Sequence, residues 1–427
     1  MNEVMLMDKG ESYEVKSLSL AEQGKKNIEW AETQMGALLK VRARFEKEKP
    51  LSNIRIGMAL HATKETAVLV RTLIAGGADV AITGCNPLSA QDDVCAALAA
   101  EGVKIWAYKG ETKDDYYRFI NNVIKFMPQI TIDDGCDLVS EIHKNHPELI
   151  KGIIAGCEET TTGIIRLKAM EKDNALKYTM IAVNDSKTKH LLDNYYGTGQ
   201  STIDGILRGT SILFAGKNVV VAGYGDCGKG VSLRARGMGA NVIITEVDHF
   251  RALQAKLDGY RVMPMKEAAK TGDIFITVTG NKHVIKKEHL MLMKDNAIVA
   301  NSGHFDVEID YNGLKAMAKK VREIRPYVEE FTLDNGKRII ALGNCRLVNL
   351  SLAEGHPSEV MSTSFCGQAL AAEYAVKNKE KLPVKVIQLP ESIDNQIAKL
   401  QLDALGVSID RLDKEQKKYM ESWQEGT

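Results

Sequence analysis

The sequence predicts an α/β protein with two doubly wound parallel-sheet domains and a C-terminal helical arm. Short apolar runs alternate with helical segments twice along the 427 residues, first from Asn53 and again from Lys217. Such alternation builds a parallel sheet with helices on its faces. At the start of the second series, Gly223, Gly225 and Gly228 form a G-x-G-x-x-G motif between a strand and a helix, which makes the fold Rossmann-like.

The first series predicts a domain over residues 1–187. Apolar positions at helical spacing over residues 20–48 indicate a surface helix ahead of it. The expected strands are 53–60, 78–83, 103–108, 129–134, 152–156 and 179–185, with helices at 63–75 and 90–100. A helix from Lys187 to Ala215 then leads into the second series.

The second series predicts a nucleotide-binding domain over residues 200–352. Its expected strands are 219–222, 241–245, 259–263, 273–279 and 297–303. A long helical stretch follows, and we expect residues 353–390 to rejoin the first domain. Residues 391–427 are amphipathic and then charged, which is typical of an arm or packing element.

Composition favours small-molecule chemistry. The chain has 56 basic and 56 acidic residues, a net charge of +0, so its electrostatics favour neither a nucleic-acid nor a membrane surface. No apolar run is long enough to span a bilayer, and the N-terminus lacks the basic start of a signal peptide. The seven cysteines form no C-x-x-C pair, so most are expected to be small apolar fillers. We expect a cytoplasmic protein.

The glycine motif predicts a bound dinucleotide. The first glycine permits a tight turn, the second lets the backbone approach a pyrophosphate, and the third lets the helix pack on the strand. Glu246 follows roughly 20 residues later, where an acid hydrogen-bonds the ribose hydroxyls of NAD. Strand ends elsewhere in this domain should also face the cofactor; they carry Asn281, Ser302, Gly303 and His304.

Other polar clusters also follow predicted strands, and each has two interpretations. Thr63 beyond His61 is either a helix N-cap or a site residue. Asp133, Asp134 and Asp137 form a solvated turn, a metal site, or a general base once burial raises a pKa.

We expect no metal, because no histidine stands at a fixed ligand spacing from these acids. Lys189 and Asp193, four residues apart, are either a surface salt bridge or part of a site. A lone histidine such as His304 is commonly structural, and only its placement favours a role.

Five separated segments together resemble the S-adenosylhomocysteine hydrolase family, in its archaeal and bacterial short-tailed form. They are VAGYGDCGKG with ITEVD, EETTTGIIRL, VNDSKTKHLLDN, SGHFDVEID and RLVNLSLAEGHPSEVMS. The resemblance implies a homotetramer of two-domain subunits with tightly bound NAD and a nucleoside thioether as substrate. NAD would oxidise the ribose 3′-hydroxyl transiently, so that homocysteine is eliminated, water adds, and the ketone is reduced again.

The resemblance also implies roles for individual residues. Thr63 and Glu65 would meet adenine, and His61 and Asp133 would handle protons and water. Glu159, Lys189 and Asp193 would hold the ribose hydroxyls, with Lys189 as base helper because desolvation can lower a lysine pKa. Asn194 would support Lys189, and His304 and His356 would face the substrate. The residues implied for NAD are Thr160, Thr161, Thr162, Asn194, Gly223, Gly225, Asp226, Cys227, Gly228, Lys229, Gly230, Glu246, Arg251, Asn281, Ser302, Gly303, His304 and Asn349.

Several alternatives stay open at this stage. Arg251, where many members have asparagine, would improve tolerance of the 2′-phosphate of NADP. Lys64 beside Glu65 is an added donor, so the substrate is the adenosyl or the inosyl thioether. The two-domain layout also fits a hydroxy-acid dehydrogenase, or a nucleotide-binding regulator without chemistry. Thr198 replaces a cysteine that many members carry, and the Lys- and Tyr-containing tail of many members is missing.

Overall fold

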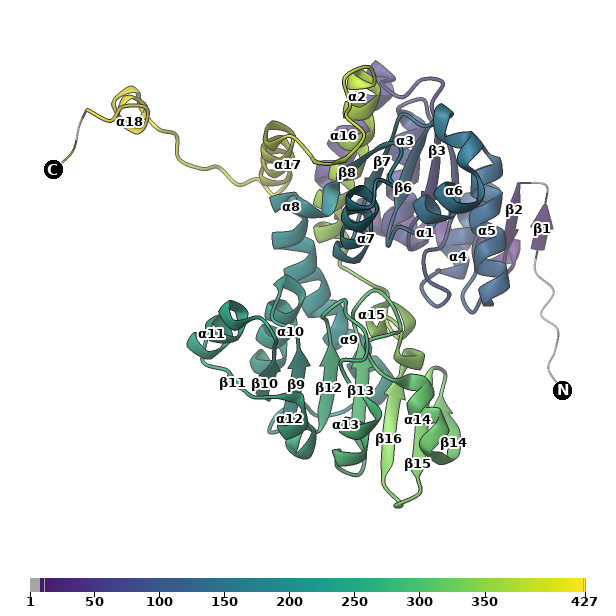
Figure 1. Ribbon diagram of the computed structural model, residues 1–427. Helices are drawn as coiled ribbons and strands as arrows, with labels where there is room; N and C mark the ends of the chain where they lie inside the picture. Colours follow the sequence, from purple (N-terminus) through teal and green to yellow (C-terminus); the bar gives the residue numbers. More distant parts are fainter. Residues whose placement is uncertain (1–7, 11, 425, 427) are drawn as a thin grey trace.

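The computed structural model describes residues 8–10, 12–424 and 426. The outermost residues of the predicted first domain and arm, 1–7, 11, 425 and 427, lie outside the described residues. Two sheet domains lie one above the other in Figure 1, and the C-terminal segment extends away from both. The predicted fold class is confirmed. Among the described residues, none of the helices has both the length and the apolar character of a membrane span.

The first sheet has the strand order β1-β2-β5-β4-β3-β6-β7-β8-β17 and is parallel except between β1 and β2. Its strands are β1 (Asp8–Gly10), β2 (Tyr13–Val15), β3 (Arg55–Ala59), β4 (Asp79–Thr83), β5 (Lys104–Trp106), β6 (Ile130–Asp133), β7 (Ala155–Glu158), β8 (Thr179–Ala182) and β17 (Val386–Gln388). Its helices are α1 (Ala21–Glu32), α2 (Gly36–Glu48), α3 (Lys64–Ala75), α4 (Asp92–Ala100), α5 (Lys113–Lys125), α6 (Asp137–Asn145) and α7 (Thr161–Lys172).

Helices cover both faces of this sheet, which explains the continuous apolar runs of its strands. One core joins the sheet to α1–α4, and a second joins it to α5–α7. The helical character predicted over residues 20–48 is confirmed, but the segment forms two helices, α1 and α2, rather than one. The chain turns between α1 and α2, and Ile28, Met35 and Phe45 are all 0% exposed. These apolar positions therefore face the core, and only side chains such as Trp30 face solvent.

The second sheet has the order β11-β10-β9-β12-β13-β16-β15-β14, with antiparallel pairing only among its last three strands. Its strands are β9 (Asn218–Ala222), β10 (Asn241–Thr245), β11 (Arg261–Val262), β12 (Ile274–Thr277), β13 (Ala297–Asn301), β14 (Ala318–Arg325), β15 (Val328–Leu333) and β16 (Arg338–Leu342). Its helices are α10 (Asp226–Gly237), α11 (His249–Leu257), α12 (Met265–Thr271), α13 (Lys287–Leu292), α14 (Tyr311–Met317) and α15 (Val348–Ser351).

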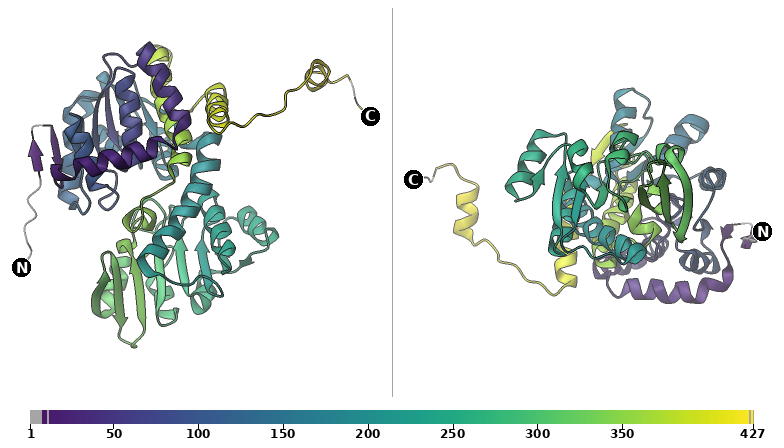
Figure 2. Two further views of the ribbon diagram at one scale, coloured as in Figure 1. Left: turned by 180° about the vertical axis from the view of Figure 1, so that it is seen from behind. Right: turned by 90° about the horizontal axis from the view of Figure 1, so that it is seen from below.

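Two segments join the domains, and both are visible from behind in Figure 2. The first is the helix predicted over residues 187–215, but it ends at Thr210 and contains a π-helical stretch. It consists of α8 (Lys187–Lys189), a π-helix labelled η4 (His190–Gly197) and α9 (Thr198–Thr210). The second is the return to α16 (Ser358–Asn378), which packs against α2 and α3 in the first domain.

The C-terminal region continues from α16 through β17 into α17 (Glu391–Ala404), which packs on α2 and α16. Asp394 of α17 accepts hydrogen bonds from the backbone N–H groups of Lys187 and Thr188, at 2.7 and 3.1 Å. The segment that projects from the body in Figure 1 therefore begins after α17 and carries α18 (Lys414–Met420).

Candidate active site

A cavity of about 1060 Å³ lies between the two domains and receives side chains from both. Most of the residues that the sequence predicted for the site line it. They are His61, Thr63, Glu65, Glu159, Thr160, Thr161, Thr162, Lys189, Asp193, Asn194, Gly223, Gly225, Asp226, Cys227, Glu246, Arg251, Asn281, Ser302, Gly303, His304, Asn349 and His356. Asp133, Gly228, Lys229 and Gly230 are absent from the lining.

Lys189 is the centre of the polar part of the cavity. Its side chain is 7% exposed, and its Nζ donates to Asn194 Oδ1 at 2.8 Å. The same Nζ lies 3.7 Å from Asp193 Oδ2 and 3.8 Å from Glu159 Oε1. Because the chain between Lys189 and Asn194 runs through a π-helix, residues five apart share one face. A regular helix would turn Asn194 away from the amine.

The expectation that the Lys189 pKa is lowered is wrong. Burial by itself lowers this pKa, but the carboxylates of Asp193 and Glu159 raise it, and the net direction is upward. Burial acts on Asp193 too, yet Lys189 and His356 hold the pKa of Asp193 below its ordinary value. Lys189 is therefore a cation paired with Asp193, and it acts as a hydrogen-bond donor rather than as a free base.

Asp134 links two histidines from opposite domains. Its carboxylate lies 3.5 Å from His61 Nε2 and 3.4 Å from His304 Nδ1. His61 follows β3, and its Nδ1 lies 2.8 Å from the Ser89 hydroxyl. Burial lowers the pKa of His61 to about 4, so its ring is neutral near pH 7. A neutral imidazole beside a carboxylate can accept a proton from a bound molecule.

The prediction that Asp133 handles protons in the cleft is corrected by its position. Asp133 is 0% exposed, and its carboxylate accepts the backbone N–H groups of Asp134 and Val139 at 3.0 and 2.9 Å. Asp133 ends β6 opposite Glu158, which ends β7, so both side chains are enclosed at the sheet edge. The next residue of each strand, Asp134 and Glu159, reaches the cavity instead.

The glycine turn fits a dinucleotide for reasons that the structure makes specific. Gly223 has φ +105°, in the left-handed region that favours glycine. A Cβ on Gly228 would lie 2.0 Å from the Gly223 carbonyl oxygen, and one on Gly230 would lie 1.8 Å from that of Tyr195. Gly228 thus lets the turn pack closely on α10, and Gly230 lets the π-helix pack closely on it. Gly225 caps α10, whose N-terminus opens toward the cavity and suits a pyrophosphate.

Glu246 stands at the end of β10 with its orientation determined by backbone donors. Tyr224 N donates to Glu246 Oε2 at 2.7 Å, and Val247 N and Asp248 N donate to Oε1 at 2.7 and 3.1 Å. An ionised carboxylate has further acceptor sites for two ribose hydroxyls. Arg251 Nη1 lies 3.7 Å from the position a Cβ would take on Gly225, so its guanidinium borders the same subsite.

Residues 194–355 match the model of the S-adenosyl-L-homocysteine hydrolase NAD binding domain, and residues 12–151 match that of S-adenosyl-L-homocysteine hydrolase. Adenosylhomocysteinase of Sulfurisphaera tokodaii is 59% identical over 97% of this chain and 100% of its own. The chain belongs to the S-adenosyl-L-homocysteine hydrolase family. A second relative, S-inosyl-L-homocysteine hydrolase of Methanocaldococcus jannaschii, is 56% identical over 97% of this chain and 100% of its own.

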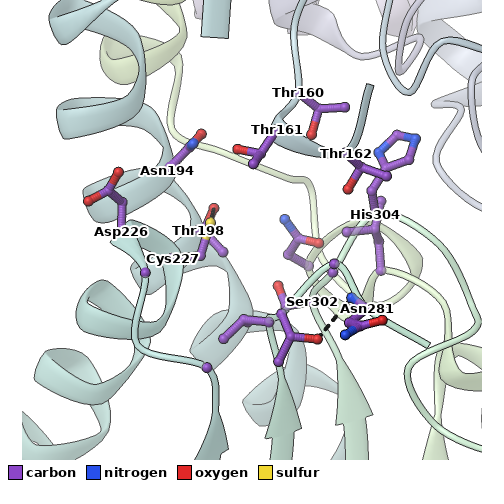
Figure 3. A pocket seen from close by; sticks show the side chains of 18 of the residues that line it. Thr160, Thr161, Thr162, Asn194, Thr198, Asp226, Cys227, Asn281, Ser302 and His304 are labelled. Carbon is purple, nitrogen blue, oxygen red and sulfur yellow. Dashed lines mark hydrogen bonds between the residues drawn. The ribbon is translucent and has the colours of Figure 1, made fainter. Parts of the chain in front are cut away.

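The match to the family's NAD binding domain indicates NAD as the cofactor, and Gly223 and Gly225 of the glycine turn line the cavity. Figure 3 shows side chains of both domains around this space, with Thr160, Thr161 and Thr162 opposite Ser302 and Asn281. Thr160 is the N-cap residue of α7, and Thr161 and Thr162 are its first two residues. Within the described residues, Glu159 Oε1 and Asn349 Oδ1 are buried and have no hydrogen-bond partner. Both atoms belong to cavity residues, so they are acceptors that a bound molecule can satisfy.

Glu308 supports a loop of the cavity, and sequence reasoning missed it. It is 1% exposed and accepts from Thr279 N and Thr279 Oγ1 at 2.9 and 2.8 Å, and from Gly280 N at 2.7 Å. It thereby shapes the loop that carries Asn281. Its presence in the segment SGHFDVEID was the available signal, but the sequence alone does not show which loop it binds.

His61, Cys85 and Asp134 form a group whose ligand atoms lie within 4.8 Å of one another, close enough for a metal ion. The spacing of these residues along the sequence gave no indication of this group. In the structure His61 Nδ1 lies 3.1 Å from Cys85 Sγ and 2.8 Å from Ser89 Oγ, so the histidine is already held by protein partners. The expectation of a metal-free site stays a prediction.

Acid should destabilise the protein through His61. Because the folded-state pKa is about 4 and the unfolded value about 6.5, the folded state binds this proton less well. The His61 contribution to the free energy of unfolding is then lost as pH falls from 6.5 to 4, in total about 3 kcal/mol. Denaturant unfolding at several pH values should show this loss in the wild type and a smaller one in His61→Gln. The control is His249→Gln, at an exposed position; equal acid sensitivity of the two variants would contradict the assignment.

Proposed function

We propose that this protein hydrolyses S-adenosyl-L-homocysteine reversibly to adenosine and L-homocysteine, with tightly bound NAD used catalytically. The observation that carries the proposal is the cluster of Lys189, Asp193, Asn194 and Glu159 in the same cavity as the glycine turn. A dinucleotide-binding turn and side chains that can hold ribose hydroxyls therefore line the same cavity. Bound NAD supplies a transient oxidation of the ribose 3′-hydroxyl.

The ribose hydroxyls are the groups that this cluster is built to hold. Ionised Asp193 and the unpartnered Oε1 of Glu159 accept hydrogen bonds from hydroxyls, while the Lys189 ammonium donates to an oxygen that gains negative charge. Asn194 and Asn184 orient the amine through bonds of 2.8 and 3.3 Å. Lys189 therefore stabilises the developing charge at the 3′-oxygen. Glu159 in its ionised form is the better proton acceptor of the two carboxylates, because burial raises its pKa to about 8 whereas the pKa of Asp193 is lowered.

We assign proton transfers at the ribose carbons next to the 3′ position to His61 and Asp134. Neutral His61 is able to accept a proton, and Asp134, between His61 and His304, stabilises the charge that forms. Asp134 thus takes the role that the sequence analysis gave to Asp133. Thr160, Thr161 and Thr162, the glycine turn, Glu246, Asn281, Ser302 and Asn349 are the residues that would hold NAD.

Replacing the central amine should remove the chemistry and leave the fold. Lys189→Met should lower kcat by about 10²–10³-fold, because a buried donor to the developing oxyanion is lost. Homocysteine release from S-adenosyl-L-homocysteine, followed with a thiol reagent, measures this. Lys187→Met is the matched control, since that side chain is 69% exposed on the same helix.

The same preparation separates the hydrolase from its alternatives. Adenosine added to the wild type should raise absorbance in the NADH band without net oxidation, and the cofactor should stay bound through gel filtration. Net NADH accumulation with a hydroxy acid would instead support a dehydrogenase. Unchanged turnover in Lys189→Met would reject the assignment of that residue, and a wild type that binds nucleoside without turnover would indicate a regulator.

The base of the substrate is adenine or hypoxanthine, because this chain is similar both to an adenosylhomocysteinase and to an S-inosyl-L-homocysteine hydrolase. The adenosyl thioether is favoured by Glu65, which is 2% exposed and lines the cavity. Its Oε1 accepts from Ser358 Oγ at 2.6 Å and lies 3.4 Å from Lys64 Nζ, so the carboxylate is fixed as an acceptor. An acceptor matches the 6-amino group of adenine, whereas hypoxanthine offers an oxygen there. Lys64 Nζ itself donates to Glu354 at 2.9 Å, away from the base.

Glu65→Gln should therefore change base preference rather than abolish activity. The amide can donate to the oxygen of hypoxanthine, so the ratio of kcat/KM for the adenosyl and inosyl thioethers should fall about tenfold. The control is Glu29→Gln, at an exposed position of α1. A wild type that prefers the inosyl thioether would overturn the choice of base.

For the subunit we propose a substrate-binding domain of residues 1–187 and 353–390, an NAD-binding domain of 200–352 and a C-terminal arm of 391–427, acting in the cytoplasm in the methyl cycle. Its assembly should be a homotetramer. Large apolar side chains on α11 and the arm support association, since Phe250 is 75%, Leu257 78%, Met420 74% and Trp423 91% exposed.

Light scattering should then give four times the chain mass of 47.0 kDa. Replacing Met420 and Trp423 together by serine should weaken the assembly. Leu213→Ser, at a side chain that is 71% exposed outside these surfaces, should leave it intact. A wild-type monomer at micromolar concentration would contradict the proposal.

A further inference from the structure

The return helix α16 sends one polar side chain to each of three carboxylates in the cleft. Ser358 Oγ donates to Glu65 Oε1 at 2.6 Å, and Ser364 Oγ donates to Asp193 Oδ2 at 2.6 Å. Gln368 Nε2 donates to Glu159 Oε2 in a short hydrogen bond. Met361 and Phe365 of the same helix line the cavity, so one face of α16 forms its wall.

The three carboxylates come from three different elements. Glu65 is in α3, Asp193 in the π-helix η4, and Glu159 follows β7. A helix rises 1.5 Å per residue, so the donors are spaced about 9 Å and about 6 Å along α16. One rigid element therefore sets the separation of the groups proposed to meet the base and the ribose.

Gln368 has an electrostatic consequence in addition to its position. It is 0% exposed, and within the described residues its Oε1 has no hydrogen-bond partner. Its amide N–H group can only donate to Glu159, which favours the ionised carboxylate. Burial opposes this and raises the pKa of Glu159 to about 8, with Lys189 lowering the pKa and Asp193 and Asp134 raising it.

We propose that Ser358, Ser364 and Gln368 are positioning residues for the hydrolase reaction, and that Gln368 keeps Glu159 available as an acceptor for a ribose hydroxyl. This rests on the function proposed above. Ser362, on the same helix, serves another purpose, because its Oγ accepts from the backbone N–H of Leu38 in α2 at 3.2 Å. Ser362→Ala thus removes a buried hydrogen bond of α16 without touching a cleft carboxylate.

The test compares Gln368→Met with Ser362→Ala in the full-length enzyme with its bound NAD. Methionine keeps the side-chain length and removes the donor. Gln368→Met should raise KM and lower kcat/KM by about 10–100-fold, as loss of a hydrogen bond to a charged group does. Because Glu159 then ionises less readily, the acid limb of the kcat/KM profile should move to higher pH by about one unit. Ser362→Ala should leave the profile and KM unchanged, whatever its effect on thermal stability.

Ser364→Ala is the second variant, should Gln368→Met fail to fold. It should raise KM in the same direction but less, since Lys189 and His356 still hold Asp193. An unchanged pH profile and KM in Gln368→Met, or an equal shift in Ser362→Ala, would overturn the positioning role. A wild type that hydrolyses neither thioether would instead reject the proposed function, so the two failures are distinct.

Discussion

The buried cation of Lys189 is the interaction on which the site depends. It lies within 4 Å of two carboxylates, from η4 and from the loop after β7, and donates to Asn194. A buried charge is tolerated only when partners compensate it, so these elements must arrive together. The π-helix satisfies that requirement locally, since it brings Lys189 and Asn194 onto one face. The same segment joins the two domains, which ties ribose handling to the domain connection.

The surrounding architecture delivers the remaining groups to this charge. The carboxyl ends of the strands in both sheets meet at the cavity, as is general for open α/β sheets. The first sheet contributes Asp134 and Glu159, and the second contributes the glycine turn, Glu246 and the loops of Asn281 and His304. α16 then crosses back behind the cleft and bonds three of its carboxylates. Side-chain hydrogen bonds from α16 thus hold the walls of the cleft together, in addition to the two chain segments that join the domains.

Two expectations failed, one because of charge compensation and the other because of the position of a side chain at a strand end. A desolvated lysine alone would have a lowered pKa, but Asp193 and Glu159 reverse the direction for Lys189. Asp133 and Asp134 are adjacent, and their residue types are identical. Only the register of β6 against β7 encloses Asp133 with Glu158 and leaves Asp134 for the cavity. Successive side chains at the end of a strand point to opposite sides, so Asp133 is enclosed while Asp134 reaches the cavity.

The sequence by itself determined the fold class and the dinucleotide turn, and most of the site residues that it predicted line the cavity. Apolar runs, the glycine spacing and Glu246 are local signals, because strand, turn and helix form from neighbours in the chain. Tertiary structure decided what depends on distant contacts. It divided residues 20–48 into two helices, exchanged Asp133 for Asp134, and kept Lys189 charged. It also revealed Glu308 and Gln368, whose partners lie 28 and 209 residues away. Burial and pairing of charge are properties of the assembled cleft, and no local pattern encodes them.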